Sequence, residues 1–360
     1  MRIAFITTTL DETVGWGRYA AGFLREARRR NGAENVLAPD PARLRSTEIR
    51  WHQPFDALRD AWMLRKSLKD VDVIHAAIEP AAPLAFFLSL ILRKPYVVSV
   101  CGTFADLRSY SKAVRWLYRL AFRRAGRMAV LSRYTLKVFE QGMKDAKTTI
   151  VYGGFTPVER VARKTSLSGE RRIVAVGAIK PRKGFHTLVE ALGLLKERGF
   201  AFRAECIGPK EPTKYVERVE ARVKELGLGD RVRFTGRVSE EELNAAYDGA
   251  DLFVLPSEHD GTAFEGLGLV YLEAMTYGLP VIGCLDSGAE DIIQDGVNGF
   301  LVPPGNPERL AAAIGRVLGD EALWKRMSEA APKSIDRFRW ETVGADMDAA
   351  YRVAIEEYAR

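Results

Sequence analysis

Short apolar runs alternate with amphipathic stretches along almost the whole chain. Runs such as RIAFITTT, VDVIHA, PYVVSVC and RMAVLS are rich in β-branched and aromatic residues and predict strands. Between them, residues 18–30, 80–92, 112–124 and 133–142 carry apolar positions at helical spacing and predict helices. Because strands that alternate with helices pair in parallel under helices on both faces, the pattern predicts an α/β fold.

This alternation occurs twice. A polar stretch at residues 156–170 interrupts it and predicts an interdomain linker. The second series places the strands RRIVAVG, FRAECIG, RVRFTG and DLFVLPS around helices at 184–198, 213–226 and 239–248, followed by a helix at 266–277, the strand LPVIG and two further helices. Since both halves share one pattern, the sequence predicts two Rossmann-like domains with ligand sites at the carboxyl ends of their strands.

Composition indicates the class of protein and its compartment. With 360 residues, 47% hydrophobic and 28% charged, the chain fits a soluble globular enzyme of two domains. Its longest apolar run, residues 81–92, is shorter than the ~20 residues of a membrane-spanning helix, and its amino terminus does not fit a secretory signal. Cys101, Cys206 and Cys284 are far apart, and their odd number argues against a disulfide framework. We therefore expect a cytoplasmic protein.

Charge is divided unevenly between the two halves. Residues 1–165 contain 29 Lys and Arg against 15 Asp and Glu, a net charge of +14, whereas residues 166–360 contain 25 against 32, a net charge of −7. The segment 111–127 interleaves six cations with the apolar residues Trp116, Leu117, Tyr118, Leu120 and Phe122. Such a helix either lies on an anionic membrane surface or buries its apolar stripe in the core behind a solvated basic face. Nucleic acid is not an expected partner, because no recognition motif accompanies the charge.

Two carboxylates stand out in the segment EGLGLVYLEA, where Glu265 and Glu273 are separated by apolar, aromatic and Gly residues alone. A helix that is apolar all round is buried, and buried carboxylates are costly without hydrogen-bond partners. Sugar and ribose hydroxyls would supply those partners, since eight helical steps span ~12 Å, about the distance across a pyrophosphate. Gly266 and Gly268 would let a phosphate approach the helix amino terminus. The alternative is a structural helix whose carboxylates form internal salt bridges or a cap.

Other candidate residues also follow strands. Lys183, in the segment 177–184, either neutralises charge on a leaving nucleoside diphosphate or lies solvated in a loop. Gly15 and Gly17 follow the first strand and permit either close ligand approach or a plain tight turn. His75 ends a strand as a core or rim histidine or as an acceptor contact. No cluster of His, Asp and Glu in the sequence suggests a metal site.

Together these motifs resemble those of the retaining family-4 glycosyltransferases of the GT-B fold. The E-x7-E spacing of Glu265 and Glu273 carries the resemblance, which covers nearly the whole chain and is strongest over residues 255–304. The segment EGLGLVYLEA looks most like that of the branch that contains phosphatidylinositol and related mannosyltransferases. The resemblance implies two Rossmann-like domains that face each other across a cleft. Their expected ranges are 1–165 for the acceptor-binding domain, 166–335 for the nucleotide-sugar-binding domain, and 336–360 for a helix that packs back onto the first.

The resemblance also implies roles for single residues. Glu265 would contact the donor sugar, Glu273 would hold the ribose hydroxyls, and Lys183 would bind the pyrophosphate. The arginine that the family carries after Gly177 is Ala178 here, which leaves open whether Lys180 or Arg182 replaces it. The expected catalytic residues are Glu265 and Lys183, the donor-binding residues are Gly15, Gly17, Gly177, Lys180, Arg182, Gly266, Leu267, Gly268 and Glu273, and the candidate acceptor contacts are Arg18, His75 and Cys101.

The implied reaction moves a hexose from a GDP- or UDP-linked sugar to a hydroxyl of a glycan or lipid-linked acceptor, with retention. No cofactor and no metal ion are expected, and the inner face of the membrane is an expected site of peripheral contact through residues 111–127. Three alternatives remain at this stage: a nucleotide-sugar epimerase, a phosphorylase, and a non-catalytic carbohydrate- or nucleotide-sugar-binding protein. The last is kept open by the missing arginine at Ala178.

Overall fold

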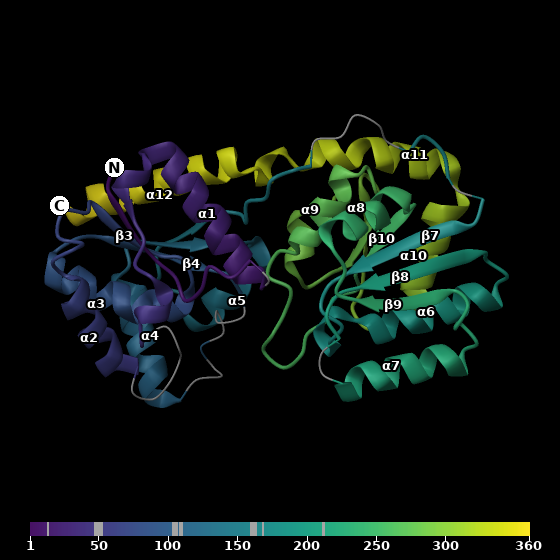
Figure 1. The fold of residues 1–360 in the computed structure, drawn as a ribbon, viewed down its shortest axis with the longest axis horizontal. Coiled ribbons are helices and arrows are strands. Elements are labelled where there is room, and N and C mark those ends of the chain that lie inside the picture. Colours follow the sequence, from purple (N-terminus) through teal and green to yellow (C-terminus); the bar gives the residue numbers. More distant parts are fainter. Residues whose placement is uncertain are drawn as a thin grey trace. The chain divides into compact units, whose positions relative to one another are not determined.

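The chain folds into two compact units. The computed structural model describes residues 1–12, 14–46, 53–102, 107, 111–158, 164–167, 169–210 and 213–360. One unit comprises Met1–Thr156 together with Arg337–Arg360, and the other comprises Pro157–Asp336 (Figure 1). The chain passes between them within the predicted linker, of which residues 159–163 and 168 lie outside the described ranges.

The first unit is a parallel sheet of six strands in the order β2-β1-β3-β4-β5-β6. Its strands are β1 (Ile3–Ile6), β2 (Val36–Leu37), β3 (Val73–Ala76), β4 (Tyr96–Val100), β5 (Arg127–Val130) and β6 (Thr148–Ile150). Its helices are α1 (Gly15–Asn31), α2 (Gln53–Leu64), α3 (Ala82–Leu92), α4 (Lys112–Arg124), α5 (Arg133–Gly142) and α12 (Trp340–Tyr358). The strand order reverses between β1 and β3, so the loops after these two strands diverge at that point.

Two apolar clusters cover the two faces of this sheet. One joins residues of α2, α3, α4 and α5 to the sheet, and the other joins α1 and α12 to the opposite face (Figure 1). The closing helix α12 is held by ion pairs from Arg30 to Asp348 and from Arg127 to Glu357. Trp340 packs so tightly on α1 that a Cβ at Gly22 would lie 2.3 Å from its ring. The helix therefore belongs to the first unit although it ends the chain.

The second unit repeats the architecture in the strand order β12-β11-β10-β7-β8-β9, again all parallel. Its strands are β7 (Arg171–Val176), β8 (Phe202–Ile207), β9 (Val232–Gly236), β10 (Leu252–Val254), β11 (Val281–Cys284) and β12 (Gly299–Val302). Its helices are α6 (Phe185–Glu197), α7 (Thr213–Glu225), α8 (Glu240–Gly249), α9 (Leu269–Thr276), α10 (Pro307–Gly319) and α11 (Glu321–Ala330). Here the order reverses between β7 and β10, which pair directly.

The predicted elements are confirmed except in four places. The sequence patterns did not indicate the short strands β2 and β12 or the helix α2, and the helix expected at 266–277 is shorter, because α9 begins at Leu269. Gly268 has a φ of 90°, a left-handed conformation that cannot continue a right-handed helix. Within the described ranges, no helix has both the length and the apolar composition required to cross a bilayer.

Candidate functional site

The candidate site lies at the reversal point of the second sheet. The loop after β7 carries the segment from Gly177 to Gly184, and the loop after β10 carries residues 255–268. A backbone hydrogen bond of 2.8 Å from Glu258 to the carbonyl of Arg182 joins the two loops. Because parallel α/β sheets bind ligands where their strand order reverses, the fold itself favours this place as a binding site.

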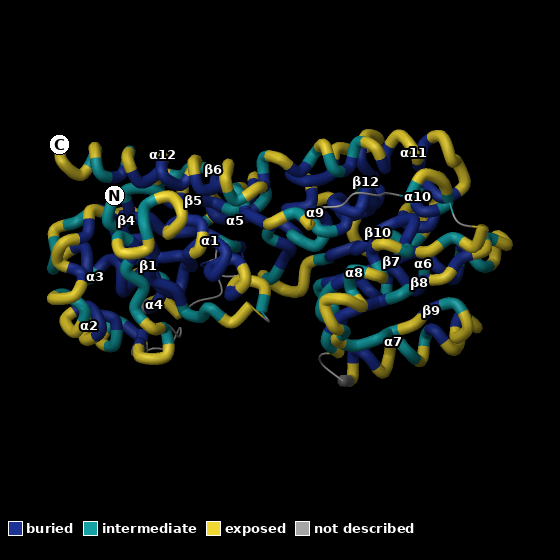
Figure 2. Tube along the Cα trace, turned by 45° about the horizontal axis from the view of Figure 1, so that its top comes forward, coloured by how far each residue is buried: buried dark blue, intermediate teal, exposed yellow. Residues whose placement is uncertain are grey.

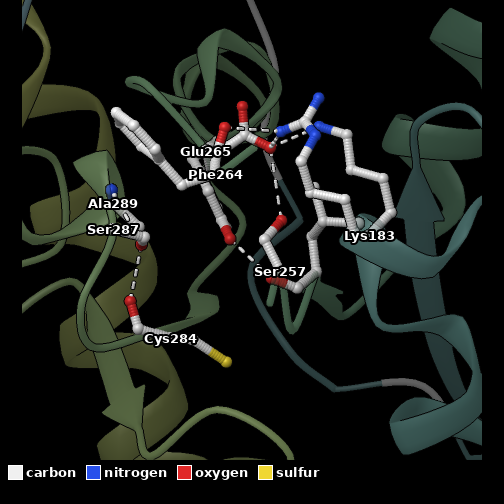
Figure 3. A network of polar contacts seen from close by, with 10 residues as sticks. Lys183, Ser257, Phe264, Glu265, Cys284, Ser287 and Ala289 are labelled. Carbon is white, nitrogen blue, oxygen red and sulfur yellow. Dashed lines mark hydrogen bonds and ion pairs between the residues drawn. The ribbon is translucent and has the colours of Figure 1, made fainter. Parts of the chain in front are cut away.

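Glu265 is the centre of a buried polar cluster. Lys183 Nζ forms an ion pair with its Oε2 atom, Arg182 Nη1 lies 3.2 Å from the same oxygen, and Ser257 Oγ donates to it at 3.3 Å. Figure 3 shows Lys183 and Ser257 converging on this carboxylate. Lys183 and Glu265 are each 8% exposed, so the charges are largely withdrawn from water. Ser257 was not predicted from the sequence as a site residue.

The electrostatics of the cluster keep Glu265 ionised. Burial alone would raise the pKa of Glu265, but the charges of Lys183 and Arg182, together with the hydrogen bonds from Lys183 and Ser257, lower it to about 2. Burial lowers the pKa of Lys183, and the carboxylate of Glu265 opposes that shift. The charge of Lys180 also contributes to the low pKa of Lys183, so a third cation lies in the neighbourhood. The arrangement is a carboxylate surrounded by excess positive charge, which suits an anionic ligand.

Gly184 explains how the two loops approach each other so closely. Its φ is 66°, and a Cβ on it would lie 1.8 Å from the carbonyl oxygen of Pro256. Glycine therefore serves both the left-handed turn and the close contact. This turn follows the single 3-10 turn Pro181–Lys183 and leads directly into α6, which fixes where Lys183 leaves the backbone.

The segment between Glu265 and Glu273 differs from its prediction. The residues from Glu265 to Gly268 are not helical, so the eight helical steps assumed between the two carboxylates are wrong. The backbone there is tied to the turn Gly288–Asp291, since the Gly288 N–H donates to the Glu265 carbonyl at 2.8 Å. Glu273 lies on α9, partly buried, and its Oε2 accepts a hydrogen bond of 3.2 Å from Tyr247.

Gly268 is the N-cap residue of α9. A Cβ on Gly268 would lie 2.6 Å from the Tyr271 ring, so packing excludes a side chain there. In the described part of the chain no side chain caps the amino terminus of α9. Leu267, immediately before it, is 2% exposed and anchors the loop in the core. The helix end is therefore positioned by apolar packing, and its first-turn amides carry the partial positive charge of the helix.

The internal salt-bridge alternative holds for Glu265. Buried carboxylates require partners, and for Glu265 the protein supplies them through Lys183, Arg182 and Ser257. Arg182 is thus engaged with Glu265 and with the Phe264 carbonyl, at 3.0 Å. Gly177 lies beside Lys183, with its Cβ position 3.4 Å from Lys183 Cε. The predicted residues of this loop are brought together at one place.

In the first unit the glycine pair has two different explanations. A Cβ at Gly17 would lie 2.0 Å from the carbonyl oxygen of Asp11, so a tight turn accounts for this glycine. At Gly15, the first residue of α1, a Cβ would meet no described atom within 4 Å, so local packing does not require glycine. Arg18 is exposed, with its Nε 3.4 Å from the Glu12 carbonyl.

The acceptor contact predicted for His75 is contradicted by its position. His75 is 0% exposed, with Nε2 2.9 Å from Ser99 Oγ and Nδ1 2.8 Å from Tyr351 Oη. Burial lowers the pKa of His75 to about 3, so the ring is neutral. Both ring nitrogens are used inside the fold, and His75 is the core histidine of the alternative interpretation.

Cys101 is joined to a buried carboxyl that the sequence analysis missed. The Cys101 and Gly102 N–H groups donate to Glu79 Oε1 at 2.8 and 3.2 Å. Burial raises the pKa of Glu79 to about 7 and that of the Cys101 thiol well above its usual value. Thr103, the next residue of this strand end, lies outside the described residues. Glu79 could have been noticed as the one acid in the apolar stretch that runs from Val73 to Leu92.

No three His, Cys, Asp or Glu side chains in the described ranges gather as a metal-binding group. The donors near Glu265 are lysine, arginine and hydroxyl groups, which bind anions rather than cations.

Comparison with known proteins adds sequence and structural relatives. The family model described as "Glycosyl transferases group 1" matches residues 159–334, and that described as "Glycosyltransferase Family 4" matches residues 15–158. An uncharacterized glycosyltransferase of Methanocaldococcus jannaschii is 28% identical over 312 residues, which cover 80% of this chain and 77% of that protein. The GDP-mannose-dependent alpha-(1-6)-phosphatidylinositol monomannoside mannosyltransferase of Mycobacterium tuberculosis is 34% identical over 191 residues, 51% of this chain and about half (48%) of that enzyme.

Two solved structures share the fold over almost the full chain. Anabaena HepE, solved in complex with UDP and glucose, has a TM-score of 0.75 at 23% identity and covers 98% of this chain and 99% of its own. Sucrose-phosphate synthase from Thermosynechococcus elongatus has a TM-score of 0.77 at 20% identity, with 99% and 100% covered. At these identities the likeness shows a common architecture of two Rossmann-like domains.

Proposed function

The chain belongs to the family-4 glycosyltransferases of the GT-B fold, and from this premise we propose that it transfers a hexose from a nucleoside-diphosphate sugar to an acceptor hydroxyl with retention of configuration. The observation that carries the proposal is the buried cluster of Lys183, Arg182 and Glu265 at the reversal point of the second sheet. GDP-mannose in the name of the mycobacterial relative and UDP in the HepE complex support GDP- or UDP-linked donors.

In this proposal the second unit binds the donor. Lys183 and Lys180 neutralise the diphosphate, whose negative charge matches the excess of cations around Glu265. The backbone amides of Leu267 and Gly268 meet the sugar or the distal phosphate at the amino terminus of α9. Gly177, Gly266 and Glu273 complete the donor site, with Glu273 on the ribose hydroxyls.

Glu265 has a double role in the proposed reaction. It pairs with Lys183, and an arriving diphosphate competes for that lysine. A carboxylate released in this way accepts hydrogen bonds from sugar hydroxyls, which is the role that the family resemblance implies. Binding thus replaces an internal ion pair with two ligand contacts of matching charge and chemistry.

The proposed transfer balances without an external base. The bond from the anomeric carbon to the diphosphate oxygen breaks, and a bond to the acceptor oxygen forms on the same face of the sugar. The proton of the acceptor hydroxyl passes to the leaving phosphate oxygen, while Lys183 offsets the charge that develops there. We propose that no metal ion takes part, since the cations at this site are side chains of the chain itself.

A thermal-shift panel of UDP-, GDP- and ADP-linked hexoses tests the donor site. We expect one donor to raise the unfolding temperature of the parent, and Lys183→Ala and Glu265→Ala to reduce that shift. Lys325→Ala, at an exposed position on α11, is the matched control and should keep it. Equal stabilisation of both site variants and the parent would refute the site.

The reaction is tested with the best donor and a panel of glycan and lipid-linked acceptors, with and without chelator. We expect an acceptor product whose anomeric configuration by NMR equals that of the donor, formed equally in chelator. Free nucleotide and a free or epimerised sugar without acceptor product would instead indicate an epimerase, and binding without turnover a non-catalytic protein. Activity that chelator removes and magnesium or manganese restores would refute the metal-independent mechanism.

A further inference from the structure

The helix α2 exposes four large apolar side chains to solvent. Phe55 is 73% exposed, Leu58 49%, Trp62 60% and Met63 47%. Their spacing of three, four and one residues places them on one face of the helix, which we call the α2 apolar face. The opposite face buries Ala57 and Ala61. Figure 2 shows both exposed and buried positions along α2. A surface helix normally presents polar residues to water, whereas α2 has its bulky apolar side chains on the outer side.

Buried polar contacts hold α2 in this orientation. Asp60 is 0% exposed, and its Oδ2 accepts the N–H groups of Arg45 and Ser46 at 2.8 and 2.9 Å. Gln53, 1% exposed, donates to the carbonyls of Ser46 and Pro80. Turning the helix to bury its apolar face would break these bonds and move Asp60 out of its partners' reach. The outward placement is therefore fixed by the fold.

Cations accompany the apolar face. The guanidinium of Arg65 stacks on the Trp62 ring, 3.6 Å from its centroid. Arg59 is exposed on α2, and Lys66 is exposed just after the helix ends. α3 packs against both α2 and α4, and all three cover the same side of the sheet (Figure 1). On α4 the apolar residues Leu117, Tyr118 and Phe122 are buried, which confirms the core-facing alternative for them, whereas Trp116 is 66% exposed.

Exposed cations are also present on α4, which covers the same side of the sheet as α2. Lys112, Arg119 and Arg123 are exposed, and the sequence from 111 to 127 contains no acid. We propose that the α2 apolar face, with Trp116 and the cations of α4, docks on the surface of an anionic lipid bilayer. Aromatic rings beside Lys and Arg are suited to the membrane interface, where the rings enter the headgroup region and the cations meet lipid phosphates.

Charge complementarity selects this occupant over a second copy of the chain. Pairing of the same face from two copies would bring the cations of α2 and α4 together, and the resulting repulsion opposes a symmetric dimer. An anionic bilayer offers both a hydrophobic interior and the opposite charge. The proposal does not depend on the proposed transferase activity, because binding to lipid can be measured without donor or acceptor.

The test is co-sedimentation of the full chain with vesicles of phosphatidylcholine, with and without phosphatidylglycerol. We expect binding to the anionic vesicles that decreases at high salt. The double variant Phe55→Ser/Trp62→Ser should bind at least about tenfold more weakly, because two anchoring rings are lost. Lys112→Glu/Arg119→Glu should weaken binding to the anionic vesicles. The control Tyr358→Ser removes an aromatic ring of similar exposure (51%) from α12 and should bind like the parent.

Circular dichroism and light scattering of the same samples complete the experiment. The α2 double variant should keep its fold, since it removes solvent-exposed rings, and all samples should have the mass of one chain. Three results would overturn the proposal: no binding of the parent to anionic vesicles, equal binding by the parent and the α2 double variant, or a parent dimer that the α2 double variant dissolves. The last would identify the face as a self-association surface.

Discussion

Removal of Lys183 should expose how strongly the buried cluster depends on its ion pair. Lys183→Met retains the length and apolar stem of the side chain but deletes the ammonium group next to Glu265. The carboxylate then keeps Arg182 at 3.2 Å and Ser257 at 3.3 Å as partners. Breaking one side of a buried pair costs about 3–5 kcal/mol, and the remaining arginine places the expectation at about 3 kcal/mol.

The pKa of Glu265 gives a second, independent magnitude. It is about 2 in the folded protein against a usual 4.5, which corresponds to about 3 kcal/mol of stabilisation from the ionised carboxylate. Because the folded pKa is the lower one, this contribution is present above pH 4.5 and is lost as the pH falls towards 2. The cost of burying charged Lys183, seen in its own lowered pKa, offsets part of it, so about 3 kcal/mol is an upper limit for the pair.

A double-mutant cycle measured by hydrogen exchange isolates the contact. Peptides from β7 and β10 report the free energy of unfolding of the second unit in Lys183→Met, Glu265→Gln and the double variant over a urea series. We expect the double variant to lose at least about 2 kcal/mol less than the sum of the single losses, because neither Lys183 nor Glu265 is left as a charge without the other. Additive losses would show that the two groups do not interact in solution and would refute the assigned geometry of the site.

Three further predictions concern a buried histidine, a buried carboxyl group and a glycine. Burial lowers the pKa of His75 to about 3, so as the pH falls below 6.5 His75 takes up a proton in the unfolded chain but not in the folded one. The free energy of unfolding of the first unit should therefore fall by about 2 kcal/mol between pH 6.5 and 5. In urea unfolding, His75→Gln should remove this pH dependence. Burial raises the pKa of Glu79 to about 7, so its effect on stability has the opposite pH dependence. The stabilisation is present below pH 4.5, and the free energy of unfolding falls by about 3 kcal/mol as the pH rises to 7. An unchanged pH profile in Glu79→Gln would contradict this prediction. Gly184→Ala should destabilise the protein by well over the ~1 kcal/mol of a left-handed alanine and weaken donor binding, because the new Cβ meets the Pro256 carbonyl. The control Gly199→Ala, with a φ of 72° and no described atom near, should cost only about that amount and leave donor binding intact.

The sequence predicts the sheets well because local pattern and tertiary role agree there. Residues of β3 and β4 are apolar and become the buried centre of a parallel sheet, so their runs are unambiguous. The helix α2 is the exception to this agreement. Phe55, Leu58 and Trp62 have helical spacing in the sequence, but spacing does not show which way an apolar face turns, and here it turns to positions where polar residues are expected. The exception to the pattern is the part of the surface for which we propose a partner.

For the candidate site, the sequence predicts that Glu265 needs partners but does not identify them. A buried carboxylate requires partners, and sequence reasoning assigned them to a ligand because it cannot see which loops meet. The folded chain brings Lys183, from the loop after β7, onto Glu265, from the loop after β10, across 82 positions of sequence. The pair is therefore a property of strand order: it forms where β7 and β10 lie side by side and their loops diverge. In the donor complex proposed above, a diphosphate that displaces Glu265 from Lys183 would restore the charge balance that the carboxylate supplies.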